Sequence, residues 1–215
     1  MARKADWYFD YVSPYPYLQL SRFRELPEDL VVRPRPVLFA ALLNHWGHMG
    51  PAEIPAKRRQ TYLYTRWLAD QRGLPFNGPP RHPFNPLALL RLTIAAGSTL
   101  EAVRTVYHHV FGEGNDGQEE HSVRALGDKL GISDVAEVLT RQSIKDELRA
   151  NTTEAIACGV FGVPTFVCAG EIFWGDDATP LFMDFLADPE MFDREPYVGI
   201  EDVVPAAQRK AGVGR

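Results

Sequence analysis

The stretch Asp6-Trp7-Tyr8-Phe9-Asp10-Tyr11-Val12-Ser13-Pro14-Tyr15-Pro16-Tyr17 decides the fold. Its aromatic and β-branched residues at 7–12 predict a buried strand, since such side chains pack well on a pleated surface. Ser13 and Pro14 predict a helix start, with the serine hydroxyl as N-cap and the proline ring at the first helical position. A second extended segment, 31–37, carries two prolines, which argue against a fully paired central strand there. A strand–helix–strand unit therefore opens the chain.

Helical periodicity dominates the middle of the chain. The pair Asn85-Pro86 predicts one helix start, and Ser98 with Glu101 forms a capping box that predicts another. A long helix is expected to end near Gly159, because glycine suits a helix C-terminus. Residues 163–168 and 171–174 then predict a hairpin across Ala169-Gly170, followed by a helix at 178–187.

This element order predicts an α/β fold with a discontinuous sheet domain. The sheet domain comprises residues 1–37 and 141–187, an all-helical insertion occupies 38–140, and a C-terminal tail follows at 188–215. The insertion and the sheet domain are expected to meet in a cleft, where ligand sites tend to lie. The tail is expected to be loop plus a short helix, because periodicity is lost after Asp188.

Composition limits the class of protein and its partners. The 215 residues, 45% hydrophobic and 24% charged, suffice for a full hydrophobic core. A net charge of −5 argues against a general nucleic-acid binder. The sequence contains neither a run of about eighteen apolar residues nor a signal-peptide apolar region, so a cytoplasmic protein without a membrane partner is expected.

Two elements have chemical potential, the helix start at Ser13 and the strand start at Pro164. A helix start presents unpaired N–H groups and a partial positive charge that favour an anion. If the peptide bond before Pro164 is cis, the backbone of Val163 is freed to face a cleft. The plain alternatives are an ordinary N-cap for Ser13 and an edge-strand start for Pro164. A thioredoxin-type sheet brings two elements in this order face to face.

Four blocks of the sequence resemble one known family. The blocks are DWYFDYVSPY (6–15), GPAEIPAKR (50–58), HPFNPL (82–87), and VFGVPTF (160–166) with FWGDD (173–177). They look like 2-hydroxychromene-2-carboxylate isomerases, which belong with kappa-class glutathione transferases in the DsbA-like branch of the thioredoxin fold. The resemblance implies a thioredoxin-like sheet domain with a large all-helical insertion.

The positions of the cysteines favour a ligand-borne thiol. DsbA-like oxidoreductases carry C-P-x-C at the helix start, where this chain has Ser13-Pro14-Tyr15-Pro16. Thiol–disulfide exchange needs an accessible thiolate, so Cys158 and Cys168 are predicted to be inert buried hydrophobes. A helix start suited to a thiolate but lacking one fits a thiol that arrives on a ligand. The resemblance implies that this ligand, the cofactor, is glutathione.

The resemblance assigns glutathione contacts residue by residue. Ser13 would stabilise the thiolate through its hydroxyl and the helix start. Val163, preceding Pro164, would pair its backbone with the cysteinyl part of glutathione. Lys57 would reach the glycyl carboxylate, although membership of a solvated run of basic residues is the alternative.

Three further positions are expected at the same ligand. Asp177 matches an acidic residue near the γ-glutamyl ammonium. Asp176 stands where serine or asparagine is usual, and an N-cap for the last helix is its alternative role. His48 stands where asparagine is frequent. Its protonated ring would donate more strongly to a carboxylate, so affinity for glutathione is expected to fall as pH rises, unless His48 is only a surface histidine.

The second substrate is expected near aromatic side chains. Asn85 matches a family loop beside the organic ligand, and a helix cap is its alternative role. Tyr15, with Trp46 and Trp174, would line an aromatic pocket, although large aromatic side chains are more often part of the core.

The implied activity is glutathione-dependent isomerisation of 2-hydroxychromene-2-carboxylate or a similar aromatic keto acid. The thiolate would add to an unsaturated carbon, the resulting single bond would rotate, and elimination would return glutathione. The expected partner is a small aromatic molecule, with no nucleic acid, membrane or metal. The oligomeric state stays open between a monomer and a homodimer, the state to which relatives tend. The alternatives are a kappa-like transferase that conjugates electrophiles, a disulfide oxidoreductase, and a non-catalytic glutathione-binding protein.

Overall fold

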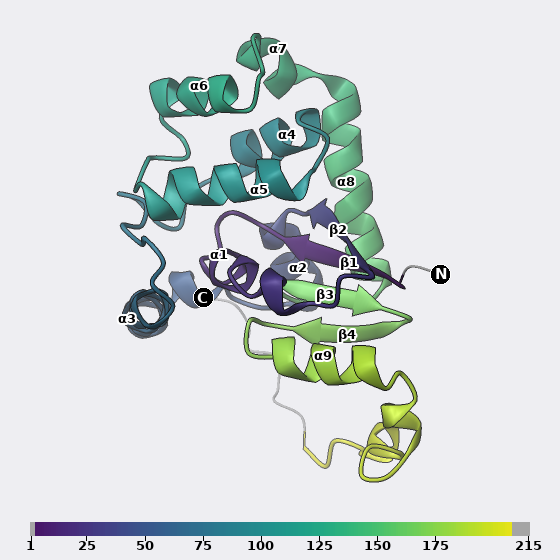
Figure 1. Cartoon of the computed structure of the whole chain (residues 1–215). Coiled ribbons are helices and arrows are strands. Elements are labelled where there is room, and N and C mark those ends of the chain that lie inside the picture. The colour runs from purple at the N-terminus through teal and green to yellow at the C-terminus, as the bar shows by residue number, and fades with distance from the viewer. Residues whose placement is uncertain (1–2, 208–215) are drawn as a thin grey trace. The chain divides into compact units, whose positions relative to one another are not determined.

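A four-stranded sheet in the order β2-β1-β3-β4 organises the first part of the chain (Figure 1). Its strands are β1 (Arg3–Phe9), β2 (Leu30–Pro36), β3 (Thr165–Cys168) and β4 (Glu171–Trp174). β1 runs parallel to β2 and antiparallel to β3, and β3 pairs antiparallel with β4. The mixed sheet, with its long helical segment between β2 and β3, confirms the predicted α/β fold class.

The computed structural model describes residues 3–207. The chain divides into two compact units, Met1–Thr179 and Pro180–Arg215. The predicted sheet segments up to Thr179 and the predicted insertion at 38–140 fall in the same unit. Their division into two domains therefore stays a prediction.

β1 is one of the two inner strands, and its aromatic side chains contribute to the core. Trp7 and Phe9 are fully buried and stack with their ring centroids 4.8 Å apart. The strand covers residues 3–9 and not the predicted 7–12, because the chain turns after Phe9, where the Ser13 N–H donates to the Asp10 carbonyl (3.1 Å). β2 is an edge strand, which explains how it tolerates Pro34 and Pro36.

The first helix, α1 (Tyr15–Leu20), begins later than predicted. Pro14 occupies the N-cap position, and the hydroxyl of Ser13 makes no capping bond. The predicted capping role of Ser13 is therefore wrong. The physical reason is that Pro16, at the third position of a helix capped by Ser13, has no N–H to donate to the hydroxyl.

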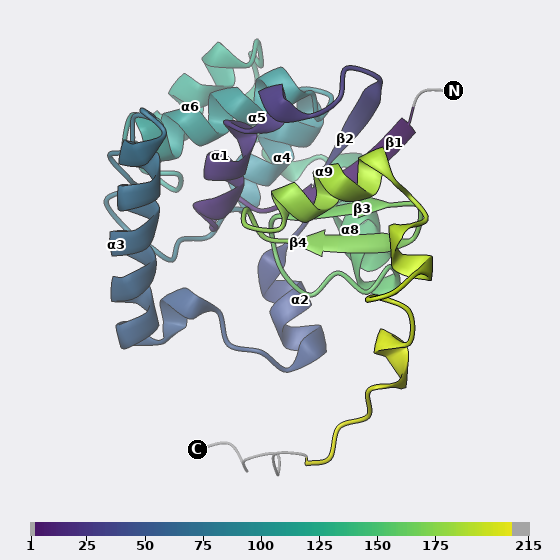
Figure 2. The ribbon, with the colours of Figure 1, turned by 60° about the horizontal axis from the view of Figure 1, so that its bottom comes forward.

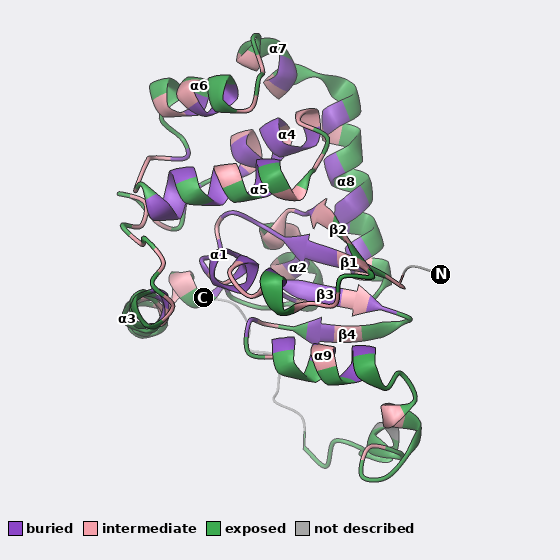
Figure 3. Cartoon of the chain, viewed as in Figure 1, coloured by how far each residue is buried: buried purple, intermediate pink, exposed green. Residues whose placement is uncertain are grey.

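The segment between β2 and β3 is almost entirely helical, as predicted. Its helices are α2 (Phe39–Trp46), α3 (Pro55–Gln71), α4 (Leu87–Ala95), α5 (Leu100–Tyr107), α6 (Glu120–Lys129), α7 (Val135–Thr140) and α8 (Gln142–Ala157). A π-helical turn, His108–Gly112, extends α5. Figure 2 shows α3 beside α1, which it contacts, and Figure 3 shows that α3 is largely exposed whereas β1 is buried.

Two further local signals at element ends were correct, and a second capping prediction was wrong. Gly159 follows α8 with φ 79°, and the β3–β4 hairpin turns through Ala169 and Gly170, both at positive φ. The capping box predicted at Ser98 is wrong, because Ser98 itself has φ 49° and Thr99 caps α5, accepting from the Ala102 N–H (3.1 Å).

The second unit contains α9 (Thr179–Ala187) from Pro180 onward and two 3₁₀ turns, Met191–Asp193 and Ile200–Asp202. These short turns agree with the predicted loop-rich tail as far as residue 207, and residues 208–215 lie outside the described residues. In the part of the chain that the structure describes, no helix is both long and apolar enough to span a bilayer.

Gln19 is a buried polar residue that joins α1 to the sheet and to the loop after β4. Its Oε1 accepts from the Trp7 indole (2.7 Å), and its Nε2 donates to the Gly175 carbonyl (2.9 Å) and to Thr179 Oγ1 (3.0 Å). Its side chain is fully buried, so water cannot reach its polar atoms, and these three hydrogen bonds satisfy them instead.

Replacing Gln19 with Leu is expected to lower the free energy of unfolding by about 3 kcal/mol, because the buried indole N–H and the Gly175 carbonyl lose their partner. Urea denaturation measures this change. The matched control is Gln60→Leu on the exposed side of α3, which should shift stability by less than about 0.5 kcal/mol. Equal stability of the two variants would contradict the structural role of Gln19.

Candidate functional site

One edge of the sheet brings the predicted site segments together. Tyr8 of β1 pairs with Thr165 of β3, which pairs with Trp174 of β4. The ends of β1 and β4 and the start of β3 therefore meet at this edge. The turn to Ser13, the Val163–Pro164 peptide and the two aspartates after Gly175 all leave the sheet there.

Ser13 is held by its backbone while its hydroxyl stays uncommitted. The residue is 8% exposed, its N–H donates to Asp10, and within the described residues Oγ has no hydrogen-bond partner. The N-terminus of α1 contributes few N–H donors and little positive potential at Ser13, because α1 has six residues and Pro14 and Pro16 carry no N–H. The hydroxyl is thus the group at this position that can donate to an anion.

The buried carboxylate of Asp10 shapes the turn that presents Ser13. Its two oxygens accept from the N–H groups of Val12 (3.0 Å) and Phe39 (2.8 Å), and the Tyr107 hydroxyl donates to its carbonyl (3.0 Å). Complete burial raises the pKa of Asp10 to about 7, and the two N–H donors oppose that rise.

The Val163–Pro164 peptide bond is cis, as the sequence allowed. The Pro164 carbonyl accepts from the Gly175 N–H (2.8 Å), which ties the start of β3 to the end of β4. No described residue bonds to the N–H or C=O of Val163. The Trp174 indole lies so close to Gly162 that a side chain there would collide with it.

The two aspartates after Gly175 have different environments. Asp176 is buried, and both of its carboxylate oxygens are bonded by Arg72, at 2.9 and 2.7 Å. Its carbonyl, and not its carboxylate, accepts from the Thr179 hydroxyl (2.7 Å), so the N-cap alternative is wrong for the side chain. Asp177 is exposed, has no ion pair among the described residues, and lies over Gly175.

The other predicted residues lie on the surrounding helices. Tyr15 is partly buried and its hydroxyl bonds with Thr61 of α3, while burial raises its pKa and the charges of both aspartates add to that rise. Lys57 in the first turn of α3 and His48 just after α2 are exposed. Asn85 Oδ1 accepts from the Leu87 N–H (3.0 Å) in the turn that precedes α4, whose N-cap is Pro86.

The structure thus gathers part of the predicted set. Ser13, Val163, Pro164, Asp176 and Asp177 share the sheet edge, with Tyr15 beside it. In the described part of the chain, no hydrogen bond or ion pair joins this group to Lys57, His48 or Asn85. The roles of all these residues toward a ligand stay predictions.

Sequence reasoning missed two residues at this site, Arg72 and His82. Arg72 holds Asp176, and no local signal marks it. His82 Nε2 lies 2.6 Å from the carbonyl oxygen of Val12, directly before Ser13. Burial lowers the pKa of His82, and the charge of Arg58 lowers it further. The sequence feature that could have pointed to His82 was its position as the first residue of the HPFNPL block (82–87).

The cysteines lie elsewhere. Cys168 is buried in β3, and burial raises the pKa of its thiol. Cys158 is exposed at the end of α8, so its predicted burial is wrong, because the chain leaves the core after Ala155 and both Ala157 and Cys158 are exposed. Neither thiol is on the turn that carries Ser13.

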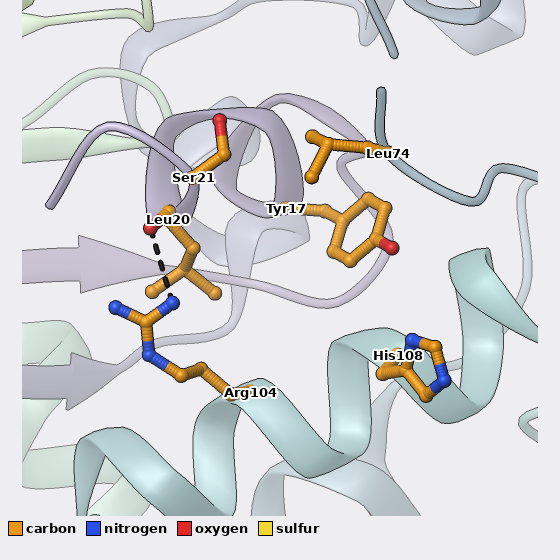
Figure 4. Close-up of a pocket in the computed structure, with 6 residues that line it drawn as sticks. All are labelled: Tyr17, Leu20, Ser21, Leu74, Arg104 and His108. Carbon is orange, nitrogen blue, oxygen red and sulfur yellow. Dashed lines mark hydrogen bonds between the residues drawn. The ribbon is translucent and has the colours of Figure 1, made fainter. Parts of the chain in front are cut away.

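A hollow of about 180 Å³ lies between α1 and residues of the predicted insertion (Figure 4). Tyr17, Leu20 and Ser21 form one wall, and Leu74, Arg104 and His108 form the other. Arg104 donates to the Leu20 carbonyl (3.1 Å) across it. This hollow adjoins the C-terminal end of α1, away from Ser13, and contains none of the predicted site residues.

Comparisons with known proteins agree with the fold. Residues 4–187 match the model of the DSBA-like thioredoxin domain. The chain is 30% identical to a 2-hydroxychromene-2-carboxylate isomerase of Pseudomonas putida, over 83% of this chain and 90% of the relative. It is 27% identical to glutathione S-transferase kappa 2 of Caenorhabditis elegans, over 85% and 91%. A solved 2-hydroxychromene-2-carboxylate isomerase superposes with a TM-score of 0.74 at 24% identity, covering 86% of this chain and 94% of that one.

The buried acid gives this site a pH-dependent stability. The folded-state pKa of Asp10, about 7, lies above its ordinary value of 3.8, so the stability that the neutral acid contributes is complete below about pH 4 and is lost as pH rises through 7. As pH rises from about 4 to 7, the free energy of unfolding of the wild type should therefore fall relative to that of Asp10→Asn, by up to about 1.4 kcal/mol per pH unit.

Urea denaturation from pH 4.5 to 8 tests this expectation, with Asp128→Asn on the surface of α6 as the matched control. A difference between wild type and Asp10→Asn that stayed constant with pH would show that Asp10 remains ionised in the folded state.

Proposed function

Because the chain belongs to the 2-hydroxychromene-2-carboxylate isomerase family, within the DSBA-like thioredoxin domains, we propose that it is a glutathione-dependent isomerase. Its substrate would be 2-hydroxychromene-2-carboxylate or a similar aromatic keto acid. One observation carries the proposal. Ser13, at the position where DsbA-like oxidoreductases have a cysteine, holds a hydroxyl without a hydrogen-bond partner among the described residues.

The groups at the sheet edge fit a bound tripeptide thiol. Val163 offers an N–H and a C=O that no described residue bonds, beside the cis Pro164, which suits pairing with a peptide backbone. Asp177 offers an exposed carboxylate for an ammonium group, and Lys57 offers a cation for a carboxylate. Asp176 is committed to Arg72, so the proposal rests on Asp177 as the acidic contact.

The protein's part in the reaction is activation and orientation. Bound glutathione would supply the thiolate that adds to the unsaturated carbon and leaves again. The Ser13 hydroxyl would donate to the sulfur, which favours its anionic form and lowers the pKa of the thiol. The Val163 backbone would hold the cysteinyl unit, and burial around Ser13 would limit competition from water.

A kappa-like glutathione transferase is the second candidate. The similarity to the kappa 2 transferase of Caenorhabditis elegans favours it, and both activities would use the same glutathione site. Incubation with hydroxychromene carboxylate, with and without glutathione, separates them. An isomerase yields the open-chain isomer and returns glutathione unconsumed, whereas a transferase yields an adduct. Conversion that did not depend on glutathione would refute the proposal.

A disulfide oxidoreductase is the weaker reading, because neither cysteine is near Ser13. Insulin reduction by the protein without added thiol would support it against the proposal. Non-catalytic glutathione binding would be indicated by tight binding without product from any aromatic keto acid or electrophile.

Replacing Ser13 with Ala is expected to lower kcat/KM about 100-fold, since it removes one donor to a developing or resting anion. The same change should raise the pKa of the bound thiol, which ultraviolet absorbance of the thiolate reports during a pH titration. Ser143→Ala, at an exposed position of α8, is the matched control. A thiol titration identical in wild type and Ser13→Ala would refute the role of the hydroxyl.

Replacing Lys57 with Gln is expected to weaken glutathione binding about fivefold, the effect of ~1 kcal/mol from one exposed charge pair. Calorimetric titration measures the Kd, and the difference should shrink at high salt because the pair is solvent-accessible. Lys145→Gln on α8 provides the control. Unchanged affinity in Lys57→Gln at low salt would place the glycyl carboxylate elsewhere.

A further inference from the structure

His82 sits directly behind the turn that carries Ser13. It belongs to the loop between α3 and α4, and its Nε2 lies 2.6 Å from the Val12 carbonyl oxygen. Its ring packs edge-on against Tyr62 of α3, with the centroids 5.4 Å apart, and against Phe84. Through Val12, the imidazole is one peptide away from the serine on which the proposed function rests.

The chemistry of the carbonyl determines the tautomer of the ring. A backbone carbonyl can only accept, so Nε2 must carry the hydrogen. Burial lowers the pKa of His82, which favours the neutral ring. In the neutral ring with hydrogen on Nε2, Nδ1 has a bare lone pair and can only accept.

That lone pair has no partner. Nδ1 of His82 is buried and unpaired among the described residues, whereas most buried polar atoms in proteins are hydrogen-bonded. The missing group must be a donor, an O–H or N–H, because an acceptor such as a carboxylate or thiolate would face another lone pair. Nδ1 therefore favours ligands that present an O–H or N–H donor over ligands that present only acceptors.

Tyr62 is the more exposed of the two aromatic side chains that pack on His82, and the one that a ligand would displace. Tyr62 covers part of the imidazole, is itself 37% exposed, and also lines a hollow of about 410 Å³ along α3 with Leu63 and Trp67. Access to Nδ1 would require the Tyr62 ring to turn toward this hollow.

We propose that Nδ1 of His82 accepts a hydrogen bond from the hydroxyl group of the aromatic substrate, while Nε2–H anchors the ring to the Ser13 turn. This inference rests on the proposed function for the identity of the substrate class. It makes His82 a specificity-determining residue that distinguishes a hydroxyl-bearing ring from the same ring without the donor. Glutathione needs no contact with it.

Equilibrium binding of two ligands tests the inference. The first is the trans open-chain 2-hydroxyphenyl keto acid, which cannot close into the chromene ring, and the second is its 2-methoxyphenyl analogue, which lacks the donor. Tryptophan fluorescence reports binding, and S-methylglutathione, whose blocked sulfur cannot add, replaces glutathione to prevent turnover. The wild type should bind the hydroxyl ligand about tenfold more tightly than the methoxy ligand.

His82→Gln is the informative variant. Its amide nitrogen can still donate to the Val12 carbonyl, but it has no ring nitrogen in the place of Nδ1, so the preference for the hydroxyl ligand should fall below about threefold. His121→Gln, an exposed histidine on α6, is the matched control and should retain the wild-type preference. Circular dichroism and S-methylglutathione affinity show whether the variant keeps the fold and the Ser13 turn.

Two results would overturn the inference. Equal affinity of the wild type for both ligands would mean that Nδ1 serves only a buried water molecule, and an undiminished preference in His82→Gln would place the acceptor elsewhere. Failure of the proposed function has a different signature, since wild type would then not convert hydroxychromene carboxylate in the presence of glutathione. A hydroxyl preference that His82→Gln abolished would support the acceptor even in that case.

Discussion

The buried carboxylate of Asp10 is the constraint on which the arrangement of the site depends. It bonds the N–H groups of Val12 and Phe39, so one side chain joins the exit of β1 to the start of α2. Its own carbonyl accepts from Ser13 and from the Tyr107 hydroxyl, which adds α5 to the same point. Ser13 is thereby positioned by contacts to its backbone alone, and its hydroxyl is left for other partners.

Predictions from the sequence succeeded where local chemistry determines structure. The aromatic strand, the Ala169-Gly170 turn and the glycine after α8 each depend on residues within a few positions. They failed where a neighbour removed the expected bond. Pro16 deprives a serine cap of an N–H, and the backbone of Ser98, at positive φ, shifts the cap of α5 to Thr99.

The part of the candidate site that follows from the order of the strands could be predicted from the sequence. Ser13, Val163 and Asp177 meet because strand pairing places their segments at one edge. The partners of those segments come from distant parts of the chain. Arg72 reaches Asp176 across 104 residues, and His82 reaches Val12 across 70, so no local pattern could identify either contact. The uncommitted state of the Ser13 hydroxyl likewise emerges only from the folded geometry.

The ties on the loop after β4 have a thermodynamic consequence. Gln19 donates to the Gly175 carbonyl, and Arg72 donates to both carboxylate oxygens of Asp176. Arg22 donates to the Asp176 carbonyl (3.3 Å). The loop is therefore ordered before any ligand arrives. A molecule that binds Asp177 does not have to order a flexible segment, which would cost about 0.5–1.5 kcal/mol for each immobilised side chain. The binding free energy of such a molecule then reflects the contacts it makes, because ordering the protein adds little entropic cost.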